Sequence, residues 1–434
     1  MTFRQNNFIQ LGSTYTGYTQ SNCNTNYISC NTTIHSIDNT RSVNVADFET
    51  YFKLPQNLNL TELKEQISRK RIFEQYLYII DKLHYRKITR NLPIDSWIPL
   101  NRDVLRKYLS KDFLHIILKE LKQLGIIECN ESYSTIKHQS KKYRLTPTYR
   151  THQTLDYKMT DKKLIKKILR KQETLINSHP VYANMYRWLG ELEISDVAKD
   201  HIQPYQYDKE MYSHLVDSID RIKRKRIYLV QGDKSNRIYT PISNLKSELR
   251  QFLSINGQPL AQVDIRNSQP LFFCLTLKDN DYINQEELSK ITQLALNGDF
   301  YSFFSPSSQS YDEQKVGVFT NILFGTVEAL KRSEQGRILQ THFPSIYAHL
   351  LASKHKNYKT LSIDMQNIEA KFIYSVCSDL YKHTQYQMPF LTIHDSIVCY
   401  ESYVETLQDA IDYYFFQMFG VRPPTKIEYF KVNQ

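Results

Sequence analysis

Two short stretches in the second half of the chain, residues 262–270 and 391–398, share one pattern of apolar and polar positions. Each has an apolar run, then an aspartate, then polar residues. The first predicts a strand that ends at Asp264, and the second predicts a hairpin with His394 and Asp395 in its turn. A carboxylate at the end of an apolar strand is costly to bury unless a cation meets it. We therefore expect Asp264 and Asp395 to share a metal ion.

Strands alternate with helices from about residue 231 to the end, which indicates an α/β or α+β region. Helices are predicted from apolar periodicity, and strands from β-branched and aromatic runs. The predicted helices cover about residues 285–297, 312–332, 334–356, 362–384 and 403–418, with a hairpin over 391–400 and an edge strand over 425–430.

A compact unit is predicted after a helical stretch within residues 58–90. Asn101 and Ser110 can cap two short helices, and Gly125 can end the second. The predicted order is helices over 101–109 and 110–124, then strands over 126–129 and 141–145. This order resembles a winged helix-turn-helix, which implies that its second helix, or a basic wing over 137–144, lies on a duplex. The alternative is a winged helix used for protein contacts or internal packing.

Cations gather in the wing and in a predicted, mainly helical region over residues 155–230. Two basic runs, 162–171 and 221–226, lie in this region. A charge run is often only a solvated face, but two runs of one sign favour contact with a phosphate backbone. The candidate nucleic-acid contacts in the wing and in the second run are Lys141, Lys142, Arg144, Arg224, Lys225 and Arg226.

The composition favours an anionic partner. The net charge is +11, and 32 tyrosines accompany 56 lysines and arginines. This suits nucleic acid, because cations track phosphates and aromatic faces stack on bases. No apolar run approaches the roughly 18 residues of a transmembrane helix, so no membrane partner is expected. Scattered cysteines without a CxxC pair, and an N-terminus without an apolar leader, predict a cytoplasmic protein with reduced thiols.

Nucleotidyl transfer is a reaction that the two aspartates could support. It needs little covalent chemistry from the protein, because two divalent ions about 3.5–4 Å apart stabilise the attacking and leaving oxygens. Mg²⁺ prefers carboxylate oxygens and keeps room for substrate phosphates. The minimum is therefore two aspartates on adjacent strands, a cation for the triphosphate and a basic cleft for the template. The chain has candidates for each.

An ordered set of motifs resembles the family A, or single-subunit, nucleic-acid polymerases. Motifs A, B and C of that family are similar to Val263-Asp264, the helix before Phe324-Gly325, and His394-Asp395-Ser396. Further likenesses lie in the run from Arg237 to Phe252, at Phe343-Pro344 and at Gln366. The resemblance covers about residues 231–434. It implies an α+β multidomain fold with an antiparallel palm sheet and helical fingers and thumb.

The resemblance also implies a role for each matching residue. Asp264, Asp395 and the backbone carbonyl of Ile265 would hold two Mg²⁺ ions, and His394 would position the primer end or the hairpin. Lys315 would meet the incoming triphosphate. The remaining substrate contacts that it implies are Phe324 and Gln269 at the nucleotide, and Arg237 and Gln366 near the primer terminus.

The sequence departs from the family pattern on the fingers helix and at two positions linked to sugar choice. Tyr311 stands where the family carries an Arg. Lys315 precedes Gly325 by ten residues, one more than usual, so either the helix has a bulge or Lys315 is not the equivalent. Lys331 and Arg332 are the alternatives for Lys315. Gln269 and Ser396 differ from the residues usual in DNA polymerases, which leaves the choice of sugar open.

We hypothesise a DNA polymerase that uses Mg²⁺, primer-template and nucleoside triphosphates and lacks a proofreading exonuclease. An RNA polymerase or primase on the same scaffold is one alternative, and a catalytically inactive DNA-binding initiator or regulator is another. Cys23, Cys30 and His35 could bind zinc, although no fourth ligand is evident. The predicted regions are an irregular or poorly ordered arm over 1–57, the winged helix-turn-helix over 58–150, a basic helical thumb-like or linking region over 151–230, and the palm and fingers over 231–434.

Overall fold

The computed structural model describes residues 50–131, 140–305, 309–384 and 388–431. Buried apolar side chains in these ranges form two clusters, one from residues 52–164 and one from residues 176–430. Every strand pairing between described residues is antiparallel. The described chain is therefore a mixed α and β protein with antiparallel sheets. The suggested zinc ligands and most of the predicted arm lie outside the described ranges.

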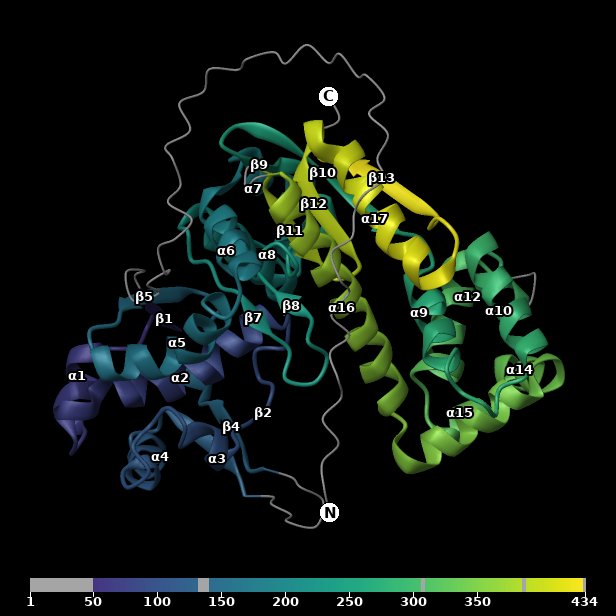
Figure 1. Cartoon of the computed structure of the whole chain (residues 1–434). Coiled ribbons are helices and arrows are strands. Elements are labelled where there is room, and N and C mark those ends of the chain that lie inside the picture. The colour runs from purple at the N-terminus through teal and green to yellow at the C-terminus, as the bar shows by residue number, and fades with distance from the viewer. Residues whose placement is uncertain (1–49, 132–139, 306–308, 385–387, 432–434) are drawn as a thin grey trace. The chain divides into compact units, whose positions relative to one another are not determined.

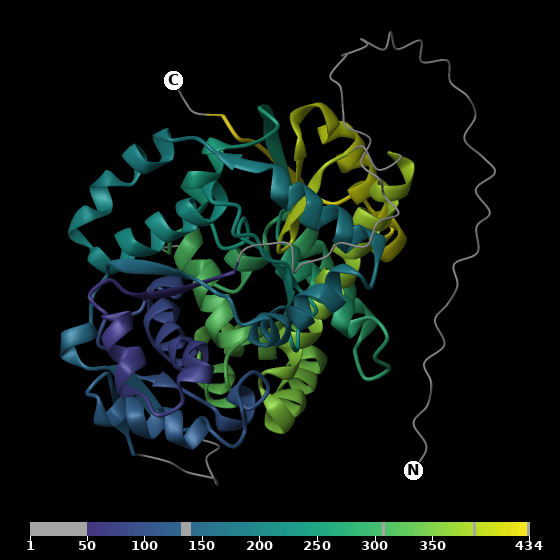
Figure 2. The same ribbon diagram turned by 90° about the vertical axis from the view of Figure 1, so that its left-hand side faces the viewer.

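The first cluster is formed by two small antiparallel sheets and the helices packed on them (Figure 2). Helix α2 is its centre, because most of its side chains are buried, including Tyr76 and Leu77 with no exposed surface. The elements are β1 (Tyr51–Pro55), α1 (Leu60–Gln66), α2 (Phe73–Thr89), β2 (Ile98–Pro99), α3 (Arg102–Leu105), α4 (Leu114–Gln123), β3 (Ile127–Asn130), β4 (Lys142–Leu145) and β5 (Thr154–Lys158).

The predicted helix starts between residues 101 and 124 are only partly correct. Asn101 caps α3 as predicted, accepting hydrogen bonds from the backbone N–H groups of Asp103 and Val104. Ser110 does not cap α4. Its backbone N–H donates to the side chain of Gln75, and the helix begins later, at Leu114. Residues 137–139 of the predicted wing, and the turn before them, lie outside the described ranges.

The prediction of an irregular arm over residues 1–57 is wrong for Tyr51–Pro55, because this segment forms the regular strand β1. It pairs with β5 along its whole length, and Leu54 is fully buried. The partner strand lies about a hundred residues away in the sequence. A short segment whose order depends on a distant partner has no local periodicity that would predict it.

A six-stranded antiparallel sheet lies within the second cluster (Figure 1). Its order is β11-β12-β10-β9-β6, with β13 paired to β10. The predicted hairpin and the predicted C-terminal edge strand are both present. The strands are β6 (Leu192–Ile194), β9 (Leu253–Ile255), β10 (Gln258–Ile265), β11 (Phe390–Ile393), β12 (Ser396–Tyr400) and β13 (Thr425–Tyr429), and a separate pair joins β7 (Val230–Gln231) to β8 (Ile238–Tyr239).

Most of the predicted helices are present, and two of them are divided. The predicted helix over 312–332 contains a π-helix, Phe319–Leu323, and the helix over 334–356 is divided where Pro344 starts a new helix. The helices are α5 (Lys162–Ile176), α6 (Pro180–Glu191), α7 (Val197–His201), α8 (Lys209–Lys223), α9 (Ser268–Leu277), α10 (Gln285–Asn297), α11 (Phe300–Phe303), α12 (Tyr311–Val318), α13 (Val327–Arg332), α14 (Glu334–His342), α15 (Pro344–Asn357), α16 (Thr360–His383) and α17 (Val404–Phe419).

The predicted linking region over 151–230 has no core of its own in the described chain. Leu164 of α5 belongs to the first cluster, and Ile176 at the other end of α5 belongs to the second. The region also contains β5 and β6, each of which joins a sheet with a strand from outside it. The boundary between the clusters therefore lies within α5. None of the described helices is long and apolar enough to cross a membrane.

Candidate active site

Strand register brings Asp264 and Asp395 together. Asp264 of β10 pairs with Ser396 of β12, and Ile393 of β11 pairs with the same Ser396. Asp395 is therefore the second residue of a two-residue turn and directly precedes the residue opposite Asp264. Facing residues on antiparallel strands have Cα atoms about 4.5–5.5 Å apart. The two aspartates consequently lie at the same end of the β10–β12 pair.

The two carboxyl groups are partly buried and close enough to repel each other. Burial and the neighbouring charge of Asp395 raise the pKa of Asp264 to about 7, while the charge of Lys315 opposes this rise. The hydroxyl of Ser268, the first residue of α9, donates to Asp395 Oδ2. Two partly desolvated carboxylates are stable together only if a proton or a cation offsets their charge.

A buried ion pair lies beside the aspartates. Arg237 donates from Nε to Glu369 Oε1 at 2.7 Å and from Nη2 to Glu369 Oε2 at 2.5 Å. Glu369, on α16, has no exposed surface. Gln269 Nε2 also donates to Glu369 Oε2, at 2.7 Å. Burial raises the pKa of Glu369 to about 7, against the lowering effect of Arg237.

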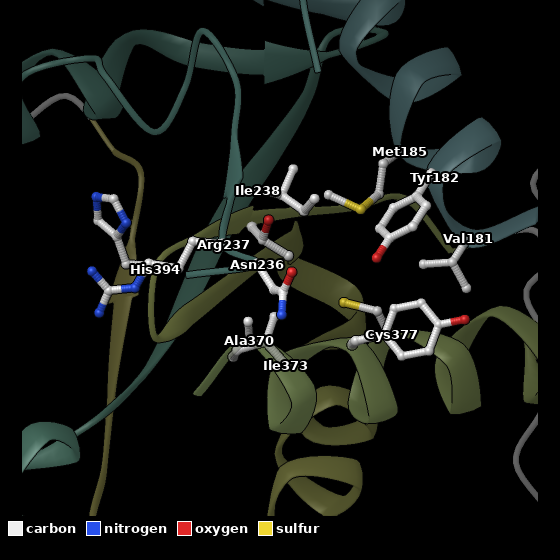
Figure 3. Close-up of a pocket in the computed structure, with 12 residues that line it drawn as sticks. Val181, Tyr182, Met185, Asn236, Arg237, Ile238, Ala370, Ile373, Cys377 and His394 are labelled. Atoms are coloured by element: carbon white, nitrogen blue, oxygen red, sulfur yellow. The ribbon is translucent and has the colours of Figure 1, made fainter. Parts of the chain in front are cut away.

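His394 adopts a left-handed backbone conformation in the hairpin turn, with φ of +54°. This conformation is uncommon for residues other than glycine. Its ring meets the ring of Tyr239 edge to face, with 5.9 Å between centroids. Burial and the charge of Arg237 lower the pKa of His394. Figure 3 shows His394 and Arg237 at one end of a small pocket that Tyr182 and Cys377 also line.

The ten-residue spacing from Lys315 to Gly325 predicted either a helical bulge or a different triphosphate-binding residue. The structure has a bulge in this segment, the π-helix Phe319–Leu323. In the π-helix, the backbone N–H of Phe324 donates to the carbonyl of Phe319 at 2.8 Å. This bond spans five residues instead of four and accommodates one extra residue. The ring centroids of Phe319 and Phe324 lie 5.3 Å apart, and Lys315 Nζ lies 5.7 Å from the centroid of Phe319. The bulge thus allows Lys315 and Phe324 to line one cleft.

The residues at the end of the π-helix are closely packed and hydrogen-bonded. A Cβ atom on Gly325 would lie 2.0 Å from the carbonyl oxygen of Thr320, so a larger residue cannot fit without movement of the backbone. Lys354 of α15 is buried, and its Nζ donates to the carbonyls of Leu323 at 3.2 Å and Gly325 at 2.8 Å. Burial lowers the pKa of Lys354 to about 8.

One cleft of about 320 Å³ gathers the predicted catalytic, metal-binding and substrate-binding residues. They come from β10, α9, α12, α16, the hairpin turn, the residue before β8 and the residue after the π-helix, so the cleft exists only in the folded chain. Lys331 and Arg332, the alternatives to Lys315, are exposed on α13 and do not line it. The lining residues are Arg237, Asp264, Ile265, Asn267, Ser268, Gln269, Tyr301, Tyr311, Lys315, Phe319, Phe324, Gln366, His394 and Asp395.

Sequence reasoning missed Glu369 and Ser268. Glu369 follows Gln366 by three residues on α16, so the two lie on one face of the helix. That spacing was a signal that could have identified Glu369. Ser268 had no comparable signal, because its bond to Asp395 joins residues 127 positions apart.

Most of the predicted nucleic-acid contacts already have partners within the chain. Arg144 Nη2 lies 3.1 Å from Glu128 Oε2, and the guanidinium of Arg144 covers the ring of Trp97 at 4.1 Å. Lys141 forms an ion pair with Glu131. Lys142 is exposed and forms no ion pair with any described residue. Among the described residues of the predicted wing, Lys142 is thus the cation most free to bind a phosphate.

The predicted contacts in the second basic run, residues 221–226, also have partners within the chain. Arg224 and Arg226 both form ion pairs with Asp156, at 2.5 and 2.7 Å, and Lys225 Nζ donates to the carbonyl of Leu192 at 2.8 Å. These bonds join α8 and the residues after it to β5 and β6. The run therefore contributes to the packing of the chain.

No protein-family model matches the chain, and no curated protein is similar to it in sequence. Among the described residues, no three His, Cys, Asp or Glu side chains gather in a way that could hold a metal ion.

Proposed function

We propose that the chain is a template-directed nucleotidyltransferase, with a DNA polymerase as the leading form. The observation that carries the proposal is the meeting of Asp264, Asp395 and Lys315 in one cleft. These residues are far apart in the sequence, and their order matches motifs A, B and C of the single-subunit polymerases. A shared cleft is what that resemblance requires of them.

The oxygen donors in the cleft fit a hard divalent cation. Burial and the repulsion from Asp395 raise the pKa of Asp264, and a cation beside both carboxylates would remove that repulsion. Asp264, Asp395 and the carbonyl of Ile265 would hold Mg²⁺, which prefers oxygen ligands. When bound, two Mg²⁺ ions would stabilise the charge that develops on the attacking and leaving oxygens.

The other lining residues bind and orient the substrates in this proposal. Lys315 meets the triphosphate, since an ammonium group binds phosphate as a point charge. The rings of Phe319 and Phe324 offer an apolar face to the base of the nucleotide. Glu369 holds Arg237 and Gln269 in one orientation, so both are positioned before the substrate arrives.

Finer features of the fold support the same proposal. The β10, β11 and β12 strands with carboxylates at one end resemble a polymerase palm, and the helices from α12 to α15 resemble fingers. Helices α3 and α4, followed by the β2-β4-β3 sheet, support a winged helix-turn-helix. The partners would be nucleic-acid primer-template and nucleoside triphosphates.

Primer extension with Mg²⁺ tests the proposal, with dNTPs and NTPs compared in parallel. Extension with dNTPs is expected, and Asp395→Asn should lower it by roughly 10³-fold or more, since several kcal/mol of charge stabilisation is lost. Primer-template binding should change by less than a few fold. Asp409→Asn, at an exposed position of α17, is the matched control.

Each other outcome has a defined meaning. A preference for NTPs, or synthesis without a primer, would identify an RNA polymerase or primase. Binding of DNA without any synthesis would identify an inactive DNA-binding protein. Synthesis that survives Asp395→Asn would refute the assignment of the metal site.

A further inference from the structure

A second, larger groove lies away from the aspartates. It has a volume of about 1000 Å³ and is lined by one wall from α3 and the residues after it, and by another from α5. Its lining is dominated by cations. The lining residues are Asp103, Arg106, Lys107, Tyr108, Lys111, Asp112, Lys167, Arg170, Lys171 and Thr174.

Four of these cations have no partner within the described chain. The side chains of Lys107, Lys111, Lys167 and Arg170 are exposed and form no ion pair or hydrogen bond with any described residue. Like charges that face one another across a groove repel, and an anion between the walls would remove that repulsion. By contrast, Arg224 and Arg226 are not free, because both form ion pairs with Asp156.

The carboxylates of the groove do not neutralise it. Asp103 accepts from Arg106 Nη1 at 3.3 Å, and Lys171 Nζ pairs with Asp233 at 3.0 Å, outside the lining. Asp112 is the remaining carboxylate. The α3 wall carries three cations and two carboxylates, and the α5 wall carries three cations and no carboxylate, so the excess of positive charge lies mainly on the α5 wall.

The two walls belong to one packed body. Leu164 of α5 is part of the first buried cluster, and Ile165 and Ile168 pack against it. Leu105 of α3 and Leu109 are buried in the same cluster. The apolar residues of α5 pack on this cluster, and the lysines and Arg170 of α5 lie on its exposed side. The core beneath the two walls therefore sets the spacing between them.

We infer that this groove binds the phosphodiester backbone of single-stranded nucleic acid. Its volume is at the upper end of pockets that hold one small ligand, about 300–1,000 Å³, so a few nucleotides of one strand fit between its walls. Cations on two walls follow the phosphates, and the half-buried ring of Tyr108 offers a face on which a base can stack. Binding at this groove requires neither Mg²⁺ nor nucleotide transfer.

The test is equilibrium binding of fluorescent oligo(dT), with oligo(U) and an oligo(dA)·oligo(dT) duplex in parallel, in EDTA. The groove variant is Lys107→Gln/Lys111→Gln/Arg170→Gln. The matched control is Lys64→Gln/Lys70→Gln/Arg71→Gln, which removes the same charge from exposed positions of α1 and the segment after it that do not line the groove. Unchanged thermal unfolding of both variants shows that each is folded.

The groove variant should lose affinity for a single strand by about 10-fold or more, and its salt slope should fall by about 2, because each phosphate contact on a single strand contributes roughly 0.7. The control should change affinity by less than a few fold. Either DNA or RNA as the preferred single strand supports the inference. Equal losses in the two variants, no loss in the groove variant, or tighter binding of the duplex would overturn it. Because the assay involves no synthesis, failure of the polymerase proposal would leave its result unchanged.

Discussion

Arg237 and Glu369, 132 residues apart in the sequence, form a two-bond ion pair in which the carboxylate has no exposed surface. The Arg237 side chain keeps 16% of its surface exposed. Gln269 donates to the same carboxylate. The pair thus joins three parts of the cleft, and each partner is the main neutralising group for the other.

Removing either partner should destabilise the fold. Glu369→Met leaves Arg237 without its carboxylate, and we expect a loss of about 3 kcal/mol, the lower end for a broken buried pair because Arg237 is partly exposed. The double variant Arg237→Met/Glu369→Met should lose less than the sum of the two single variants. Urea unfolding of all four proteins measures this coupling. Additive losses would mean that the two side chains do not stabilise each other.

The end of the π-helix should tolerate only glycine. In Gly325→Ala the new Cβ would lie 2.0 Å from the Thr320 carbonyl, so the backbone must move, and we expect a loss of roughly 2–4 kcal/mol. Gly190→Ala is the matched control. Its Cβ would have only Ile227 Cδ1 nearby, at 4.0 Å, and it should be neutral or stabilising by about 0.5–1 kcal/mol. Thermal unfolding measures the change in stability of the two variants. Equal changes would argue against close packing of Gly325 on the Thr320 carbonyl.

Lys315 should act on nucleotide binding if the polymerase proposal is correct. Lys315→Met should raise KM for the nucleotide by about 10-fold or more, because one charged contact to phosphate is lost. The affinity for primer-template should stay within a few fold. Lys331→Met, at an exposed position outside the cleft, is the control. A larger effect from Lys331 would move the triphosphate contact to α13.

The buried His84 should make stability fall in acid. Burial and the nearby charges of Lys87, His152 and Lys53 lower the pKa of His84 to about 3, from 6.5. Between these values the unfolded chain binds a proton that the folded chain does not, so stability declines as pH falls below 6.5. The slope from this group is about 1.4 kcal/mol per pH unit.

His84→Gln, which does not titrate, isolates this contribution. The stability of the variant should depend less steeply on pH between 6.5 and 4 than that of the wild type. Urea unfolding across this range gives both slopes. Parallel curves would show that His84 is not the group responsible.

Local sequence patterns predicted much of the candidate site. The β11–β12 hairpin, the strand carrying Asp264 and helix α16, which carries Gln366, lie where periodicity and turn residues indicated. The spacing from Lys315 to Gly325 also raised the alternative of a bulge, and the π-helix occupies that interval. These features depend on residues within a few positions of each other, so a single sequence carries their signal.

The sequence by itself determined the strand that carries Asp264, the hairpin turn and the helical segments that carry Lys315 and Gln366, because backbone geometry and apolar periodicity are local. Helix α9, which carries Ser268 and Gln269, was not among the predicted helices. Tertiary structure alone decided which charged groups meet. Glu369 bonds to Arg237, and Asp156 bonds to Arg226, across 132 and 70 residues of chain. An ion pair depends on the distance between two atoms in space, and local spacing does not reveal that distance. For the same reason, only the folded chain separates paired cations such as Arg226 from unpaired ones such as Lys107.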